Sequence, residues 1–136
     1  MCLFCAIVAG TEPASVVYAD ANTLAFMNIR QANAGHVLVI PKPHIETVDQ
    51  LPLDIAGELF QTVVRVSQAL KRTLNPDGMN LWQSNGAGAG QEIPHVHVHV
   101  FPRINDDDKV QFYKTSPPYA ERAYLDELTT MIRAGF

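Results

Sequence analysis

Several features that are scarce in this 136-residue sequence exclude whole classes of protein. No apolar run approaches the roughly 20 residues needed to cross a bilayer. The segment MCLFCAIVAG has no basic residues ahead of its apolar stretch, as a secretory signal would have. Lys and Arg together number 10 against 14 for Asp and Glu, so a broad cationic surface for long nucleic acid is excluded. We therefore expect a cytoplasmic protein that binds neither membrane nor long nucleic acid.

Cysteine is also scarce, because the chain has two and both lie within the first five residues, at Cys2 and Cys5. Two cysteines exclude a framework of several disulfides. In a reducing compartment, so close a pair is more typical of a metal or redox site than of a structural disulfide. The alternative is two buried thiols that behave as small apolar side chains.

The content of apolar residues is ordinary, at 47%, with 18% charged. A chain of this length and composition forms one domain with a full core and leaves no room for a second. We expect a single domain over residues 1–136, with its core at about 3–104 and a tail with a helix at 105–136.

The most informative stretch is residues 91–103, in which His95, His97 and His99 alternate with three valines. The β-branched valines favour a strand, whose period of two places the imidazoles on one face and the valines on the other. Imidazole is well suited to act as nucleophile, acid or base near neutral pH, so we expect the histidines to face a cleft. The alternatives are a metal-binding HxH strand and a solvent-facing strand with no role in chemistry.

The rest of the pattern predicts an α+β fold with an antiparallel sheet of about five strands, one long helix and a C-terminal helix. Apolar residues recur at steps of three and four over residues 52–74, which indicates the long helix. The C-terminal helix is expected at about 119–132. Besides the histidine stretch, strands are expected at 16–18, 23–28, 36–41 and 79–83.

From His95 to Phe101 the sequence resembles the histidine triad (HIT) family, whose signature is His–apolar–His–apolar–His followed by two apolar residues. The resemblance extends over residues 4–103. It implies a compact α+β domain, usually a homodimer with the long helix and the strand after it at the interface. It also implies binding of nucleotides and cleavage of their α-phosphate linkage. Asn28 is more similar to the Fhit branch than to the Hint branch, while the layout resembles bacterial-type members.

The resemblance also implies catalytic roles. His97 would attack the α-phosphorus and form a covalent nucleotidyl-histidine, which water then hydrolyses. His99 and His36 would hold phosphate oxygens or fix the tautomer of His97. For His36 alone, a core histidine bonded to a backbone carbonyl is the alternative. No redox cofactor is expected.

By the same resemblance, a purine nucleotide would lie in an apolar base slot, with its ribose on an amide and its phosphates along the glycine-rich loop 84–91. The residues so implied are Phe4, Ile7, Phe26 and Ile29 for the base, Asn28 for the ribose, and Ser84 or Asn85, Gly90 and Gln91 for the phosphates. Separately, Arg103 is a cation expected near the cleft edge to meet a distal phosphate, and a solvated surface residue is the alternative. Read without the resemblance, the apolar positions are plain core and the loop a plain hairpin connection. Glu92 departs from the Hint pattern, since a serine is common there and a carboxylate repels phosphate.

A structural zinc site is implied at Cys2, Cys5, His44 and His95, because some bacterial-type relatives carry zinc in this arrangement. Four protein ligands leave no open position for water, so such a zinc would stabilise the fold without taking part in the reaction.

The sequence thus predicts a hydrolase or transferase acting on a dinucleoside polyphosphate or a nucleoside phosphoramidate. One alternative is a nucleotide-binding interaction protein with little turnover. The other is a metal-dependent enzyme that uses the HxHxH face.

Overall fold

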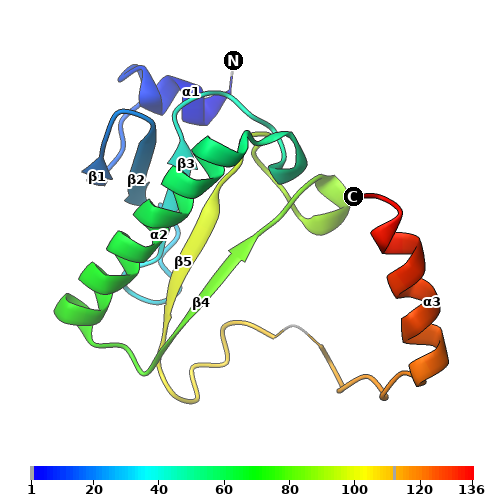
Figure 1. Ribbon diagram of the computed structural model, residues 1–136. Coiled ribbons are helices and arrows are strands. Elements are labelled where there is room, and N and C mark those ends of the chain that lie inside the picture. The colour runs from blue at the N-terminus through cyan, green and yellow to red at the C-terminus, as the bar shows by residue number, and fades with distance from the viewer. Residues whose placement is uncertain (1, 112) are drawn as a thin grey trace.

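An antiparallel sheet of five strands, in the order β1-β2-β3-β5-β4, organises the computed structural model, which describes residues 2–111 and 113–136 (Figure 1). The strands are β1 (Val16–Ala19), β2 (Thr23–Met27), β3 (Val37–Pro41), β4 (Gly78–Gln83) and β5 (Val98–Arg103). The first three form the meander of consecutive strands, and β5 inserts between β3 and β4. The α+β class and the antiparallel sheet predicted from the sequence are confirmed.

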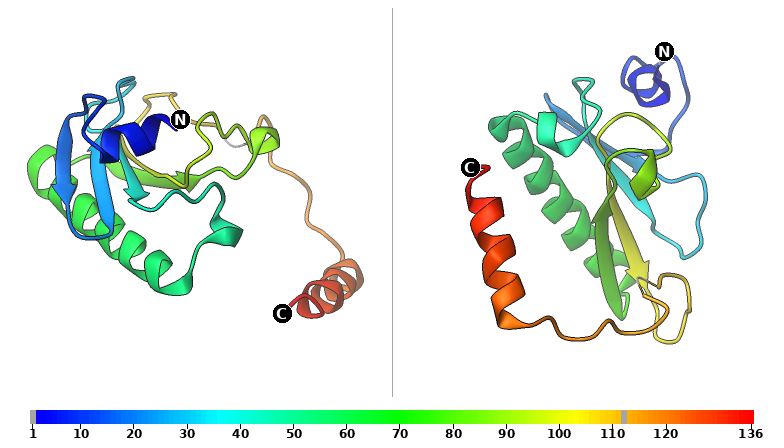
Figure 2. Two further views of the ribbon diagram at one scale, coloured as in Figure 1. Left: turned by 90° about the horizontal axis from the view of Figure 1, so that it is seen from above. Right: turned by 90° about the vertical axis from the view of Figure 1, so that its right-hand side faces the viewer.

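Helices cover the two faces of this sheet unequally (Figure 2). The long helix α2 (Leu53–Leu74) crosses one face, and the short α1 (Leu3–Val8) lies over the other. The 3₁₀ turns η1 (Val48–Gln50) and η2 (Ala87–Ala89) lie in the connections. Two apolar clusters result because β3 is buried on both faces: Val37 and Val39 pack toward α2, and Leu38 and Ile40 toward α1.

The histidine strand is shorter than predicted. Regular pairing with β3 begins at Val98, so His99 lies in β5 but His95 and His97 precede it. The reason is that the chain leaves β3 here, and the Val96 N–H donates instead to the Ile45 carbonyl. The separation of faces persists, since Val96 and Val100 are in the core under α2.

The C-terminal helix α3 (Arg122–Arg133) begins three residues later than expected and stands apart from the rest of the chain (Figures 1 and 2). It has no buried residue. Among the described residues, no helix combines the length and apolar character required to traverse a bilayer.

Candidate functional site

A cavity of about 850 Å³ opens on the α1 side of the sheet and brings together the three predicted catalytic histidines, His36, His97 and His99. Its walls come from α1, the β1–β2 side, β4, the loop before β5 and the turn after it. The residues that these walls contribute include Phe4, Phe26, Asn28, Trp82, Ser84, Gly90, Glu92 and Lys109.

The ring of His97 is held in one tautomer. Its Nδ1 lies 2.7 Å from the backbone oxygen of His95, and because a carbonyl only accepts, Nδ1 carries the proton. Nε2 is therefore left with its lone pair. The ring lines the cavity and packs edge-on against Phe4, with centroids 5.2 Å apart. This is the arrangement that a nitrogen nucleophile needs.

His99 is fixed by contacts on several sides. Its Nδ1 lies 2.9 Å from Nε2 of His36, which joins the two rings by a hydrogen bond. Trp82, its register partner on β4, stacks on it with ring centroids 4.4 Å apart and planes 10° apart. Such stacking leaves the imidazole little freedom to rotate.

Burial keeps these rings uncharged. It lowers the pKa of His97 and of His36, and it lowers the pKa of His99 to about 3, with the neighbouring His97 and His36 adding to the effect. The three rings are therefore neutral imidazoles at pH 7. The nearby Glu92 carboxylate acts in the opposite direction on the pKa of His97.

The residues expected at the base and ribose all line the cavity: Phe4, Ile7, Phe26, Asn28 and Ile29. Phe4 and Phe26 are nearly inaccessible and meet edge to face at 5.3 Å, so they form its apolar wall. The Asn28 Oδ1 accepts from the Arg30 N–H at 2.9 Å.

The glycine-rich loop divides into residues that line the cavity and residues that hold the loop. Ser84 and Gly90 line the cavity. Asn85 instead accepts from the Val48 N–H at 2.7 Å. Gln91 accepts from the Gly86 N–H at 2.6 Å and donates to the Glu46 carbonyl at 2.7 Å. Neither Asn85 nor Gln91 lines the cavity, and both act as ties for the loop.

Arg103 also lies away from the cavity lining. Its guanidinium forms an ion pair with Asp107 and donates to the Asn80 Oδ1 at 2.8 Å. Hydrogen bonds from Arg103 hold the pKa of Asp107 well below its usual range. The pair anchors the turn after β5, beyond which Lys109 reaches the cavity.

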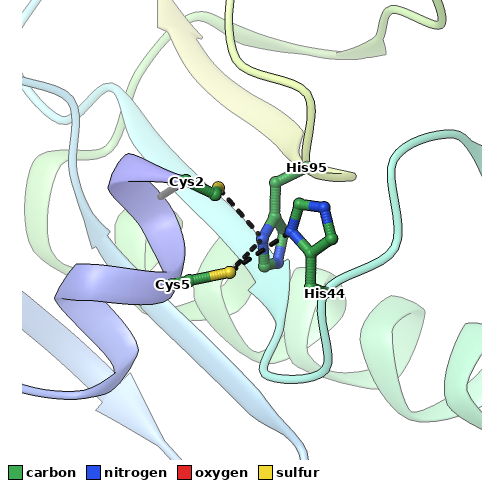
Figure 3. A group of neighbouring side chains, drawn as sticks. All are labelled: Cys2, Cys5, His44 and His95. Atoms are coloured by element: carbon green, nitrogen blue, oxygen red, sulfur yellow. Dashed lines mark hydrogen bonds between the residues drawn. The ribbon is translucent and has the colours of Figure 1, made fainter.

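A second cluster gathers around the side chain of His95 (Figure 3). Ligand atoms of Cys2, Cys5, His44 and His95 all lie within 4.8 Å of one another. The Cys5 Sγ is 3.2 Å from Nδ1 of His44 and 3.7 Å from Nδ1 of His95, and the Cys2 Sγ is 3.6 Å from the latter. Tetrahedral zinc, with bonds of about 2.3 Å to sulfur and about 2.05 Å to nitrogen, separates such atoms by about 3.5 Å.

The orientation of the His95 ring also fits the binding of a zinc ion. This fully buried ring has Nε2 at 2.8 Å from the Pro41 carbonyl, so Nε2 carries the proton and Nδ1 presents its lone pair to the thiols. A backbone carbonyl on the far nitrogen is the usual outer-shell partner of a histidine that binds metal. The four residues therefore have the donor set, the spacing and the tautomer for a closed Cys₂His₂ zinc site.

Trp82 and Lys109 are among the residues that line the cavity without having been predicted as site residues. The alternation along β4 could have placed Trp82 beside His99, because the two share a face once the register of β4 and β5 is known. No sequence signal pointed to Lys109.

Comparison with known proteins gives a consistent result. A family model described as HIT domain matches residues 9–106. The chain is 44% identical to an uncharacterized HIT-like protein of Methanocaldococcus jannaschii, over 81% of this chain and 84% of that protein. It is 35% identical to the adenosine 5'-monophosphoramidase of Schizosaccharomyces pombe, over 78% of this chain and 77% of that protein. It is also 35% identical to the adenylylsulfatase HINT3 of Arabidopsis thaliana, over 78% of this chain and 54% of that protein.

Solved structures extend the likeness to nearly the whole chain. A member of the HIT family from Bacillus subtilis has a TM-score of 0.93 at 35% identity, covering 99% of this chain and 96% of that chain. A zinc-bound histidine triad family protein from Mycobacterium smegmatis has a TM-score of 0.75 at 36% identity, covering 96% of each chain.

Proposed function

The chain belongs to the HIT domain family, and from this premise we propose that it is a nucleotide hydrolase acting through a covalent nucleotidyl-histidine. One observation carries the proposal. Nδ1 of His97 is protonated and bonded to the His95 carbonyl, so that the bare Nε2 belongs to a neutral ring at the cavity. A plain nucleotide-binding protein has no need of a nucleophile fixed in this way.

The proposed reaction has two displacements at the α-phosphorus. Nε2 of His97 attacks it, a P–N bond to the ring forms, and the bond to the leaving group breaks, with the departing atom taking up a proton from solvent. Water then attacks the nucleotidyl-histidine and breaks the P–N bond. This step returns a proton to solvent, releases the nucleoside monophosphate and restores the lone pair on Nε2. His99 faces the phosphate oxygens, and its hydrogen bond to His36 fixes the orientation of its ring.

The substrate we propose is a purine nucleotide whose α-phosphate carries a small leaving group, such as an amine in a phosphoramidate. The support comes from the similar phosphoramidase and adenylylsulfatase. The nucleotide would place its base on the wall of Phe4 and Phe26 and its ribose near Asn28. A dinucleoside polyphosphate is the second candidate, since the Lys109 ammonium at the cavity suits a longer phosphate chain.

We further propose that Cys2, Cys5, His44 and His95 hold a structural zinc ion, which joins α1 to the segments before α2 and β5. When bound, it would supply a cross-link and no open coordination position. The similar zinc-bound protein of Mycobacterium smegmatis supports this assignment.

A cytoplasmic homodimer is also proposed. β4 is at the edge of the sheet, and Leu81 on this strand is 43% exposed. On α2, the apolar side chains of Phe60 and Val64 are 58% and 42% exposed. An edge strand can pair with a strand of a second copy, and this pairing would also cover the exposed apolar side chains.

The test is the intact mass of the protein after brief incubation with an adenosine phosphoramidate or, separately, a diadenosine polyphosphate, quenched in alkali. The wild type is expected to gain one nucleotidyl group and to release AMP. His97→Asn is the matched control, because its amide can still donate to the His95 carbonyl but offers no nucleophilic nitrogen. AMP release by His97→Asn at the wild-type rate would refute the mechanism. If the wild type binds nucleotide without turnover, the chain is a binding protein.

A further inference from the structure

The C-terminal helix α3 exposes an apolar face that its own chain does not cover. Tyr124, Leu128, Met131 and Ile132 recur at steps of three and four and so share one side of the helix. Met131 is 65% exposed and Ile132 64%. Figure 2 shows α3 separated from the sheet and from α2, on the side of the sheet that α2 covers.

Despite this isolation, α3 keeps its position in a related protein. The likeness to the solved Bacillus subtilis protein covers 99% of this chain with a TM-score of 0.93. The tail from residue 119 onward is more than a tenth of the 136-residue chain, so that score requires the tail to superpose as well. A helix with no buried residue holds a fixed place only if something outside the chain holds it.

The chain carries an apolar groove of suitable character. It has a volume of about 410 Å³ and runs between the C-terminal half of α2 and the β1–β2 side of the sheet. Tyr18, Val66, Ala69 and Leu70 line it, with Arg65 among the lining residues. Glu127 of α3 flanks the apolar face and has the charge opposite to that of Arg65.

This groove and α3 lie at opposite sides of the same molecule. Figure 1 places α3 beyond β4, whereas β1 and β2 form the other edge of the sheet. On α2, helical periodicity separates Ala69 and Arg65, on the groove flank, from Phe60 and Val64 on the other.

A two-fold axis at β4 brings the groove and the helix together. Antiparallel pairing of β4 with its copy makes one ten-stranded sheet with both α2 helices on the same face. Strands lie about 4.8 Å apart, so the partner's β1–β2 side lies roughly 20 Å beyond β4. Helix α3 likewise lies beyond β4, on the face of the sheet that α2 covers (Figures 1 and 2).

We propose that α3 is an exchanged arm, whose apolar face docks into the groove between α2 and the β1–β2 side of a second copy of this chain. This inference rests on the proposed function, in which two copies of the chain pair through β4. It adds a second, reciprocal contact between α3 of one copy and the groove of the other, remote from the cavity. Since each copy gives one arm and receives one, the dimer is closed and leaves no further groove open.

Sedimentation of full-length variants provides the first test. Leu128→Lys places a charge at the centre of the apolar face of α3 and is expected to raise the dimer dissociation constant at least tenfold. Thr130→Lys, on the opposite face of α3, is the matched control and is expected to change that constant less than twofold. Equal constants for Leu128→Lys and the wild type would overturn the proposal. So would equal weakening by both variants.

Cross-linking in trans provides the second test and separates the arm from the dimer. Ala69→Cys and Leu128→Cys are purified separately, mixed to exchange subunits, and treated with a short bis-maleimide. Peptide mapping identifies the linked pair, so that products of the native Cys2 and Cys5 are not counted. A covalent heterodimer is expected from this pair, at several times the yield from Ala69→Cys mixed with Thr130→Cys or with wild type. Dimers that sediment normally but do not cross-link would overturn the arm and leave the β4 pairing intact. Monomers throughout would overturn both.

Discussion

Two histidines that are two residues apart, His95 and His97, bond backbone carbonyls through opposite ring nitrogens. His95 uses Nε2, toward Pro41, and turns Nδ1 to the thiols of Cys2 and Cys5. His97 uses Nδ1, toward His95 itself, and leaves Nε2 for the cavity. Both rings are buried, and burial lowers the pKa of each.

The contrast shows how one stretch of sequence supplies two kinds of site. A carbonyl on one nitrogen fixes the proton there, and the other nitrogen becomes a lone-pair donor. For His95 that donor meets a closed set of metal ligands, and for His97 it meets a space large enough for substrate. The first site should therefore stabilise the fold and the second should react, so mutation should separate stability from activity.

The largest effect is expected from comparing His97→Asn with His95→Asn. His97→Asn should lower kcat by about 10⁴-fold, or about 5.5 kcal/mol, because the attacking nitrogen is gone. Its thermal midpoint should stay near that of wild type. His95→Asn should do the reverse, lowering the midpoint while the folded fraction retains most activity. Steady-state AMP release and thermal unfolding measure the two. Loss of activity in both variants with normal stability would show that the clusters act as one site.

Removal of zinc should give the next largest effect, and on stability alone. For a metal present at roughly 1,000 times its dissociation constant, removal costs about 4 kcal/mol of unfolding free energy, or roughly 10 °C for a domain of this size. A strong chelator should produce this shift in wild type and none in Cys5→Ser. AMP release well below the transition should change less than threefold. If the chelator instead abolished turnover without moving the midpoint, the metal would be catalytic.

Much of the sheet could be predicted because its strands carry strong local signals. The run Val37–Ile40 is apolar on both faces, and α2 has a clear helical period, so their bounds differ by a residue or less from expectation. The extent of β5 could not be predicted, since its start depends on a contact between Val96 and Ile45, far apart in sequence. Helix α1 has six residues, too few to show a period.

The site residues also divide into those that carry a local sequence signal and those whose position depends on distant contacts. His97, His99 and the residues implied at the base slot all line one cavity, although Ile29 is 97% exposed there. Asn85, Gln91 and Arg103 lie outside the cavity lining, because a side chain's partner in a loop depends on tertiary contacts: Val48, Glu46 and Asp107 respectively. Trp82 shows the converse, since only the register of β4 and β5 places it on His99.

Acid should lower the free energy of unfolding by protonating the cavity histidines, His99 above all. The pKa of His99 is about 3 in the folded protein against about 6.5 when unfolded. Between these values the unfolded chain binds a proton that the folded chain does not, so the free energy of unfolding falls as pH falls below about 6.5. After allowance for its partial exposure, His99 should contribute roughly 0.5–1 kcal/mol per pH unit.

This pH effect is measured by denaturant unfolding from pH 7 to pH 4, with chelator present in every sample so that zinc release is not part of the difference. His99→Asn should flatten the slope relative to wild type, while the remaining buried histidines still contribute theirs. Parallel slopes for the two proteins would mean that His99 is protonated in the folded state well above pH 3.

The smallest effect concerns Glu92, whose carboxylate raises the pKa of His97 and therefore lies within electrostatic reach of it, at the cavity. A phosphate bound at His97 would meet that negative charge. Glu92→Gln should lower KM by roughly fivefold, or about 1 kcal/mol, since a repulsion across a partly solvated gap is removed. kcat should change little, because the His97 ring is neutral with or without the carboxylate. Glu12→Gln, which removes an equal charge outside the cavity lining, is the control. A fall in kcat of more than tenfold would instead assign Glu92 to proton transfer at the leaving group. The cavity site would then include a carboxylate, which the Cys/His cluster around His95 lacks.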